Sequence, residues 1–283
     1  MRKVSGVNMF EQDELKIYRG SGIKITPKIT VTQPTIGQIE EFGEKRYFNA
    51  VHTLCAVGAD LKWQLWDYYN IDYTKIDDYD LFVQYIWMAV SSKKRIYNEL
   101  MSNPEKYEKE IASLSKDAMD EMLVNPLQLV LEDIDLGDFT LCKNEATDQI
   151  VLYDVERDIT IDKVVYTQIV DVVRRIHGFK RNNEKPANKT TKMILIEDAR
   201  MEAMKASKQP YKSILKPLIS ALTVKCGMCG DERIWNMPIN AFFDNLKRAS
   251  KIQDAELLLQ GAYSGFASLK NVDRSRLEWA GDI

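Results

Sequence analysis

The stretch from residue 29 to residue 90 constrains the fold more than any other part of the chain. It holds the densest run of large aromatic side chains, which are Trp63, Trp66, Tyr68, Tyr69, Tyr73, Tyr79, Phe82, Tyr85 and Trp87. Because aromatic rings bury the most apolar surface per residue, we expect the hydrophobic core to form around this stretch. No constellation of catalytic residues stands within it, so its composition favours packing and protein interaction over chemistry.

The first third of the chain combines short strands with helices. Strands are predicted for residues 15–18, 23–25 and 29–31, with a turn at Gly20-Ser21-Gly22. After Pro34 the apolar residues recur every three or four positions, which predicts helices over 35–55, 59–69 and 78–90. Thr35 is placed to cap the first of these helices, with Gln38 reaching back to it. Asp77 is placed to cap the last one.

The second half repeats this combination. Alternating residues at 139–142 and 149–153 predict a β-hairpin, which residues 159–161 extend. The apolar positions from 165 to 176 predict an amphipathic helix that ends at Gly178. Further helices are predicted from residue 193, over 214–222, over 239–252 and over 255–266. We therefore predict an α+β fold that is predominantly α-helical, with short N-terminal strands and a central β-hairpin packed with helices.

We predict two parts within this fold. Residues 1–136 would form the N-terminal strands and the aromatic-rich helical region, and residues 137–283 would form the hairpin and the C-terminal helices. One continuous domain is the alternative. Residues 180–192 hold five basic side chains against the single acid Glu184, which predicts a flexible basic loop. Its Lys180 and Arg181 are candidates for contact with an acidic partner.

Composition bounds the class of protein. The formal net charge of −3 argues against a chain whose main task is to coat nucleic acid. Four cysteines are too few for a secreted disulfide scaffold, which fits a reducing compartment. No run of about 18 apolar residues predicts a membrane span, and the N-terminus lacks the apolar segment of a signal peptide. We expect a cytoplasmic protein that does not bind membranes.

One motif is typical of metal or redox chemistry. Cys226 and Cys229 have the two-residue gap of a zinc knuckle or a dithiol centre. Tetrahedral zinc needs four ligands, and the remaining cysteines and histidines are isolated from each other in the sequence, at positions 52, 55, 142 and 177. We therefore favour a tight turn with incidental thiols, and we expect no metal, no cofactor and no catalytic residue. A zinc-binding or nucleic-acid-binding protein is the weakest alternative.

Two blocks of sequence near the ends of the chain carry a family resemblance. The first includes Gln33-Pro34-Thr35-Ile36-Gly37-Gln38-Ile39 and Gln64-Leu65-Trp66-Asp67. The second includes Trp235-Asn236-Met237-Pro238, the run from 242 to 252 and Gly261-Ala262-Tyr263-Ser264-Gly265. Both blocks resemble proteins encoded in the tail-gene clusters of phages and prophages of Gram-positive bacteria. The middle of the chain, from 166 to 222, resembles them less distinctly.

The resemblance implies a tail morphogenesis factor that is similar to tail assembly chaperones. Such chaperones are understood to coat the hydrophobic tape measure protein, to bring tail-tube subunits to it, and to be absent from the finished particle. We therefore expect a non-enzymatic protein of the host bacterial cytoplasm that binds tape measure or tail-tube proteins and that forms homo-oligomers. The partner-binding candidates are Trp63, Trp66, Tyr69, Lys180, Arg181, Phe242 and Phe243.

The length of the chain leaves an alternative open. Many tail chaperones are short and are made in two lengths by ribosomal frameshifting, and 283 residues is long for the short form. A structural component of the virion, such as a tail subunit or a head–tail connector subunit, is therefore the nearest alternative.

Overall fold

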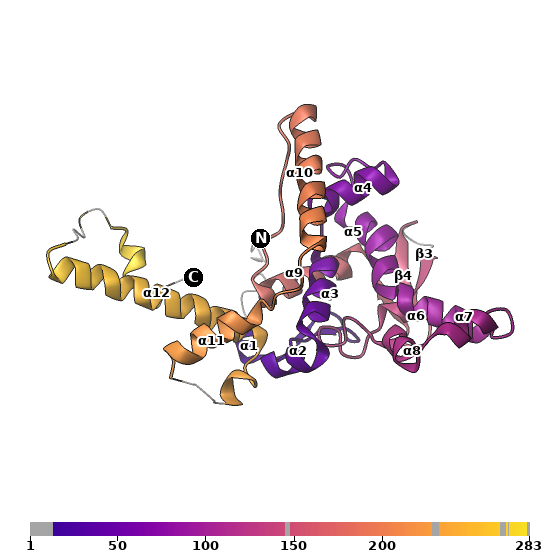
Figure 1. Cartoon of the computed structure of the whole chain (residues 1–283), viewed down its shortest axis with the longest axis horizontal. Helices are drawn as coiled ribbons and strands as arrows, with labels where there is room; N and C mark the ends of the chain where they lie inside the picture. Colours follow the sequence, from indigo (N-terminus) through magenta and orange to yellow (C-terminus); the bar gives the residue numbers. More distant parts are fainter. Residues whose placement is uncertain (1–13, 145–147, 228–231, 267–269, 271, 282–283) are drawn as a thin grey trace, which may run out of the picture.

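The structure is a computed structural model, and it describes residues 14–144, 148–227, 232–266, 270 and 272–281 (Figure 1). Most of the described chain is helical, and two small antiparallel sheets of two and three strands accompany the helices. The predicted fold class, α+β and predominantly α-helical, is therefore confirmed. No helix in the described ranges is long and apolar enough to cross a membrane.

The chain starts with a helix where the sequence predicts a strand. Helix α1 spans Glu14–Arg19 and is followed by the predicted strands β1 (Ile23–Lys24) and β2 (Thr30–Val31), which pair antiparallel with each other. A four-residue apolar run does not separate helix from strand by its period. Here Ile17 is buried while Leu15 is 83% exposed, and α1 packs on the later helix α12 (Ile239–Tyr263). The strand prediction for 15–18 is wrong because this contact selects the helical period.

The aromatic-rich region begins with two helices. Helix α2 spans Ile36–Phe42, and α3 spans Glu44–Cys55. The predicted capping box is confirmed, since the Thr35 hydroxyl accepts a hydrogen bond from the backbone N–H of Gln38 and the Gln38 side chain accepts one from the backbone N–H of Thr35. Gly43 separates the two helices with a φ of 99°, a backbone conformation that glycine tolerates best.

Shorter helices follow up to residue 138. They are η2 (Gly58–Leu61), α4 (Lys62–Tyr69), α5 (Asp78–Leu81), the π-helical turn η3 (Phe82–Ile86), α6 (Trp87–Ser102), α7 (Glu108–Ser113), α8 (Lys116–Leu123) and η4 (Leu136–Asp138). The Asp77 carboxylate caps α5 by accepting the backbone N–H of Tyr79 at 3.0 Å, as predicted. The helix predicted over 59–69 starts with a 3₁₀ turn, η2, before α4.

The predicted central hairpin and its third strand are confirmed. Strands β3 (Thr140–Lys143), β4 (Ile150–Asp154) and β5 (Ile159–Ile161) form an antiparallel sheet in the order β3-β4-β5. Leu152 of β4 lies opposite Leu141 on one side and Ile161 on the other. Helix α9 (Lys163–His177) then ends at Gly178, which takes a left-handed conformation with a φ of 66°, as the sequence predicts.

The C-terminal part holds three helices, two of which are the longest among the described residues. They are α10 (Lys189–Ser207), α11 (Leu215–Lys225) and α12, with short 3₁₀ turns at η5 (Glu232–Ile234) and η7 (Arg274–Arg276). The two helices predicted over 239–252 and 255–266 form the single continuous helix α12. Pro217 lies in the first turn of α11, where its missing N–H breaks no hydrogen bond.

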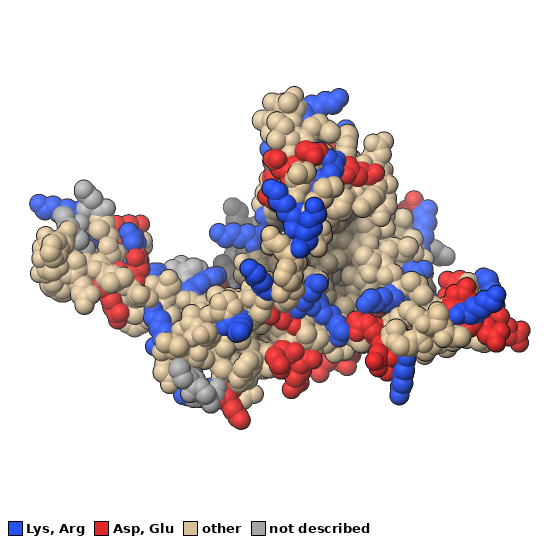
Figure 2. All heavy atoms as spheres, in the orientation of Figure 1, with Lys and Arg blue, Asp and Glu red and all other residues tan. Residues whose placement is uncertain are grey.

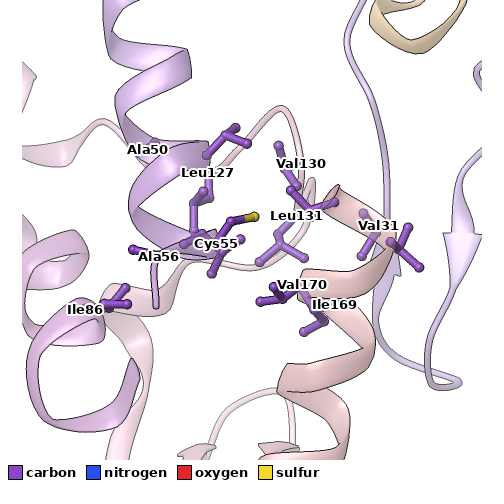
Figure 3. Packing of buried hydrophobic residues seen from close by; sticks show 14 of the residues in the cluster. Val31, Ala50, Cys55, Ala56, Ile86, Leu127, Val130, Leu131, Ile169 and Val170 are labelled. Atoms are coloured by element: carbon purple, nitrogen blue, oxygen red, sulfur yellow. The ribbon is translucent and has the colours of Figure 1, made fainter. Parts of the chain in front are cut away.

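One hydrophobic core joins these elements. Val31 of β2, Cys55 of α3 and Val170 of α9 lie in it together with Leu127 and Leu131 of the segment after α8 (Figure 3). The buried cluster includes residues from both sides of position 136, so the two predicted parts share this core. Three helical parts project from the body, and these are α10, the distal end of α12, and the group of α6, α7 and α8 (Figure 1).

Candidate partner-binding surfaces

The predicted aromatic candidates lie on α4, which packs beside α10 (Figure 1). Trp63 and Trp66 are partly buried against the core, while Tyr69 is 53% exposed. Tyr68, which the sequence analysis did not select, is the most exposed ring of this region at 69%. The aromatic run on α4 therefore has a core-facing part and a solvent-facing part, and only the latter is available to a partner.

The two exposed rings, Tyr68 and Tyr69, form a continuous group with two partly buried ones, Trp63 and Tyr85. The ring of Trp63 lies edge-on to Tyr68 with centroids 5.6 Å apart, Tyr68 contacts Tyr69 at 6.4 Å, and Tyr69 contacts Tyr85 at 4.5 Å. We call these four residues the tyrosine cluster. Tyrosine and tryptophan are enriched in interface hot spots because their rings bury a large area and lose little conformational entropy. The tyrosine cluster thus has the composition of a contact surface.

Helix α10 is fastened beside α4 mainly by ion pairs. Arg200 donates two hydrogen bonds to Asp67, at 2.7 and 2.8 Å, and Lys192 contacts Asp72 at 2.7 Å. Burial alone would raise the pKa of Asp72, but hydrogen bonds from Lys192 and Thr74 lower it to about 2. Of the 19 residues of α10, Ile196 alone is buried. This helix is therefore held by charge on one side and left open on the others.

The open side of α10 carries an apolar stripe. Met193, Ile194, Met201 and Met204 are between 37% and 55% exposed, and we call them the Met stripe. Because successive residues of an α-helix are about 100° apart, these four fall within an arc of about 100°, which also contains the exposed Glu197. By the same measure the arc begins about 20° from Arg200, and its centre lies about 110° from Ile196, so the stripe borders the ion-paired side of the helix. Figure 2 shows both uncharged and basic side chains over the end of α10 that lies farthest from the body.

A second apolar surface lies between α11 and the distal part of α12. It is an open groove of about 1190 Å³ whose lining includes Pro217, Ala221 and Val224 from α11 and Leu257 and Tyr263 from α12. We call it the distal groove. At its base, the Lys225 ammonium donates a hydrogen bond of 2.8 Å to the Gln253 side chain, which ties the two helices together.

Two predicted candidates, Phe242 and Phe243, lie at the other end of α12. Phe242 is fully buried, so its prediction as a partner contact does not fit this position, and Phe243 is partly buried against the core. The reason is that the first turns of α12 pack against α9 and α1. The apolar residues that stay exposed on α12 are farther along, beginning at Leu257.

The predicted basic loop makes specific contacts. Arg181 binds the Asp78 carboxylate through two nitrogens, and Glu184 pairs with Lys62 at 2.7 Å. Asn182 donates to Asp60 at 2.8 Å. Lys180 is exposed and has no ion-pair partner within the described residues. Residues 189–192 belong to α10, so the loop is shorter than predicted, and of its two candidates Lys180 alone presents an unpaired charge.

A polar cleft surrounds His52. It measures about 460 Å³ and its lining includes Cys55, Asp60, Arg174 and Lys180. The Asp60 carboxylate accepts a hydrogen bond from the backbone N–H of Val57, and the Arg174 guanidinium donates one to the carbonyl oxygen of Cys55. Both side chains therefore stabilise the local backbone. Burial raises the pKa of the Cys55 thiol to about 12, and burial lowers the pKa of His52. A thiol with so high a pKa is a poor nucleophile.

The second histidine, His177, is buried next to this cleft. Its Nδ1 lies 2.7 Å from the carbonyl oxygen of Val173 and its Nε2 lies 2.6 Å from the Tyr47 hydroxyl. The carbonyl can only accept, so Nδ1 carries the proton and Nε2 accepts from Tyr47. Burial lowers the pKa of His177 to about 4. The imidazole is therefore a neutral core group whose two nitrogens are both occupied.

The candidate metal motif is only partly described. Cys226 is exposed at the C-terminal end of α11, and Cys229 lies outside the described residues. Across the described ranges, no three side chains of the His, Cys, Asp and Glu types are arranged to hold a metal ion.

Set against protein-family models, curated proteins and solved structures, the chain matches none of them. Its function therefore has to be argued from the surfaces described above.

Proposed function

We propose that this chain is a non-enzymatic factor of phage tail morphogenesis that binds a tape measure or tail-tube protein through the Met stripe and the tyrosine cluster. The observation that carries the proposal is α10, a 19-residue helix with one buried residue and an exposed apolar stripe. The tail assignment rests on the sequence resemblance. The binding role rests on the surface.

Leaving an apolar stripe of this kind exposed to water is unfavourable unless another molecule covers it. Monomeric soluble proteins seldom expose large contiguous apolar patches, and those that do generally bind other molecules there. Methionine side chains are unbranched and polarizable, so they adapt to partners of differing shape. The Met stripe runs along the helix axis from Met193 to Met204, a distance of about 16 Å at 1.5 Å per residue. That length suits contact with several turns of a helix in the partner.

The adjoining tyrosine cluster suits the same partner. Tyr68 and Tyr69 present rings with a polar hydroxyl at the edge, so they can cover apolar surface and still donate hydrogen bonds to a polar rim. Arg200 pairs with Asp67 and also with Glu197, a carboxylate within the arc of the Met stripe, so these charges offset one another at the edge of the contact surface. A long, helical, partly hydrophobic protein is the class of partner that this surface fits best, and the tape measure protein of a phage tail belongs to that class.

The test is co-expression with the tape measure protein and, separately, the tail-tube protein encoded beside this gene. The double variant Met201→Glu/Met204→Glu places two charges in the Met stripe. We expect the amount of copurified partner to fall more than about tenfold, since each buried methionine contributes about 1.5 kcal/mol or more. The matched control is Val155→Glu, which changes an apolar residue that is 69% exposed on the turn after β4.

The control should copurify as well as the unmodified chain does. Equal recovery of partner with the double variant would overturn the role of the Met stripe, and no recovery with any chain would overturn the choice of partner. The structural alternative is tested on particles. Mass spectrometry of purified virions should not detect an assembly factor, whereas stoichiometric amounts of the chain would identify a structural subunit.

A further inference from the structure

We infer that two copies of this chain associate through the distal ends of their α12 helices, each copy placing Tyr263 and Phe266 in the distal groove of the other. The starting observation is that α12 leaves the core before it ends. Ala255 is the last buried residue of this helix, and the eight residues after it include none that is buried. Figure 1 shows this end of α12 projecting away from the body.

The projecting end is apolar rather than polar. Tyr263 is 89% exposed and Phe266 is 93% exposed, and Leu257 and Val224 are more than half exposed beside them. An aromatic side chain offers about 150–250 Å² of surface, so the two rings together offer roughly 350 Å². A standard interface buries about 800 Å² on each partner. The two rings alone would therefore supply nearly half of the area that such an interface buries on each partner.

The arrangement is self-complementary. A two-fold contact requires that the projecting group and the cavity that receives it lie on the same patch of each subunit. The distal groove meets this condition, because Tyr263 stands at its edge and Phe266 follows three residues later. When two α12 ends lie antiparallel across a two-fold axis, each pair of rings faces the other copy's groove.

The charges in the groove permit this contact. Among its lining residues, the described structure places one carboxylate, on Glu256, and one ammonium group, on Lys225. A patch with several charges of one sign would repel its own copy, whereas this patch has no net charge. Its other polar groups, on Ser220, Gln253 and Gln260, are neutral and suit the rim of an interface. A second copy is therefore an electrostatically acceptable occupant.

This inference does not rest on the proposed tail function, because the distal groove and the Met stripe are separate surfaces. The experiment is sedimentation velocity of the full chain from about 1 μM to about 200 μM. We expect a concentration-dependent shift from monomer to dimer. In Tyr263→Glu, association should weaken at least about tenfold because a charge would enter the partner's groove. The matched control is Val164→Glu, which is 62% exposed on α9 and should dimerise normally.

A second measurement tests the geometry. A photoreactive phenylalanine analogue at position 263, in a mixture of isotopically light and heavy chains, should crosslink to residues 217–225 of the other copy. A chain that stays monomeric at the highest concentration would overturn the inference. So would a Tyr263→Glu variant that dimerises like the unmodified chain, or crosslinks between copies that map away from α11 and α12. Circular dichroism should show that all variants keep the same helical content.

Discussion

The buried neutral imidazole of His177 predicts how the stability of the fold depends on pH. Its Nδ1 donates to the Val173 carbonyl, its Nε2 accepts from the Tyr47 hydroxyl, and burial lowers its pKa to about 4. In the unfolded chain the same side chain titrates near pH 6.5. Between these two values the unfolded chain binds a proton that the folded chain excludes.

The sign and the size follow from proton linkage. Above pH 6.5 the imidazole is neutral in both states, so its contribution to stability is complete. As the pH falls from 6.5 to 4, the free energy of unfolding decreases, because the unfolded state takes up the extra proton. The pKa difference corresponds to about 3 kcal/mol over this window. Burial also lowers the pKa of His52, so it acts in the same direction.

The assay is urea unfolding, followed by tryptophan fluorescence, at a series of pH values from 8 down to 4.5. The variant His177→Gln removes the titration while its amide can still donate and accept hydrogen bonds. It should be less stable at pH 8 but should lose most of the slope between pH 6.5 and 4.5. The variant His52→Gln is the control, and it should keep the larger part of the slope.

The Asp72 carboxylate changes the stability of the fold in a lower pH range than His177 does, so the two effects can be separated. The pKa of Asp72 is lowered to about 2, so the stability that this carboxylate contributes is present above pH 3.8 and is lost only as the pH falls towards 2. A free energy of unfolding that stays flat between pH 6.5 and 4.5 in the unmodified chain would refute the assignment of His177 as a neutral buried group.

Three further predictions test the packing. Phe242→Ala should reduce the free energy of unfolding by about 3–5 kcal/mol, because Phe242 is fully buried. Phe243→Ala should reduce it by less than about 2 kcal/mol, because Phe243 is only partly buried. Equal losses in the two variants would contradict this difference in burial. Gly58→Ala should cost about 1–3 kcal/mol, since a Cβ there would collide with the carbonyl oxygen of Tyr73, and an unchanged melting temperature would contradict this packing. Arg200→Ala should speed amide hydrogen exchange in α10 by up to about fivefold, with little change in the exchange of α9. Equal changes in both helices would show that the ion pairs do not hold α10 locally.

Local signals in the sequence predicted much of the fold. The Thr35 capping box, the Asp77 cap and the glycine end of α9 are interactions between residues a few positions apart, so the sequence contains everything that decides them. The β3-β4 hairpin and β5 follow from alternation for the same reason. These features needed no knowledge of the rest of the chain.

The features that the sequence did not predict all depend on contacts between residues far apart in the chain. Residues 15–18 form a helix because Ile17 packs under α12, and Phe242 is buried because α9 covers it. Buried and exposed apolar positions have the same period in a sequence, so Met201 and Tyr263 could not be distinguished from core residues. They are exposed because α10 and α12 project from the body of the molecule, and no local sequence pattern predicts that projection.

The attachment of α10 explains how an apolar stripe can stay exposed on a helix that is fixed to the body. A helix of 19 residues has a limited circumference, and docking it by an apolar face would have buried the residues that a partner needs. The pairs of Arg200 with Asp67 and Lys192 with Asp72 hold it with charged groups, each worth about 1 kcal/mol or less at a partly exposed site. The helix is thereby positioned at small cost in apolar surface. Because these pairs are weak, α10 should be the first long helix to open, and a bound partner should slow its hydrogen exchange more than that of α9.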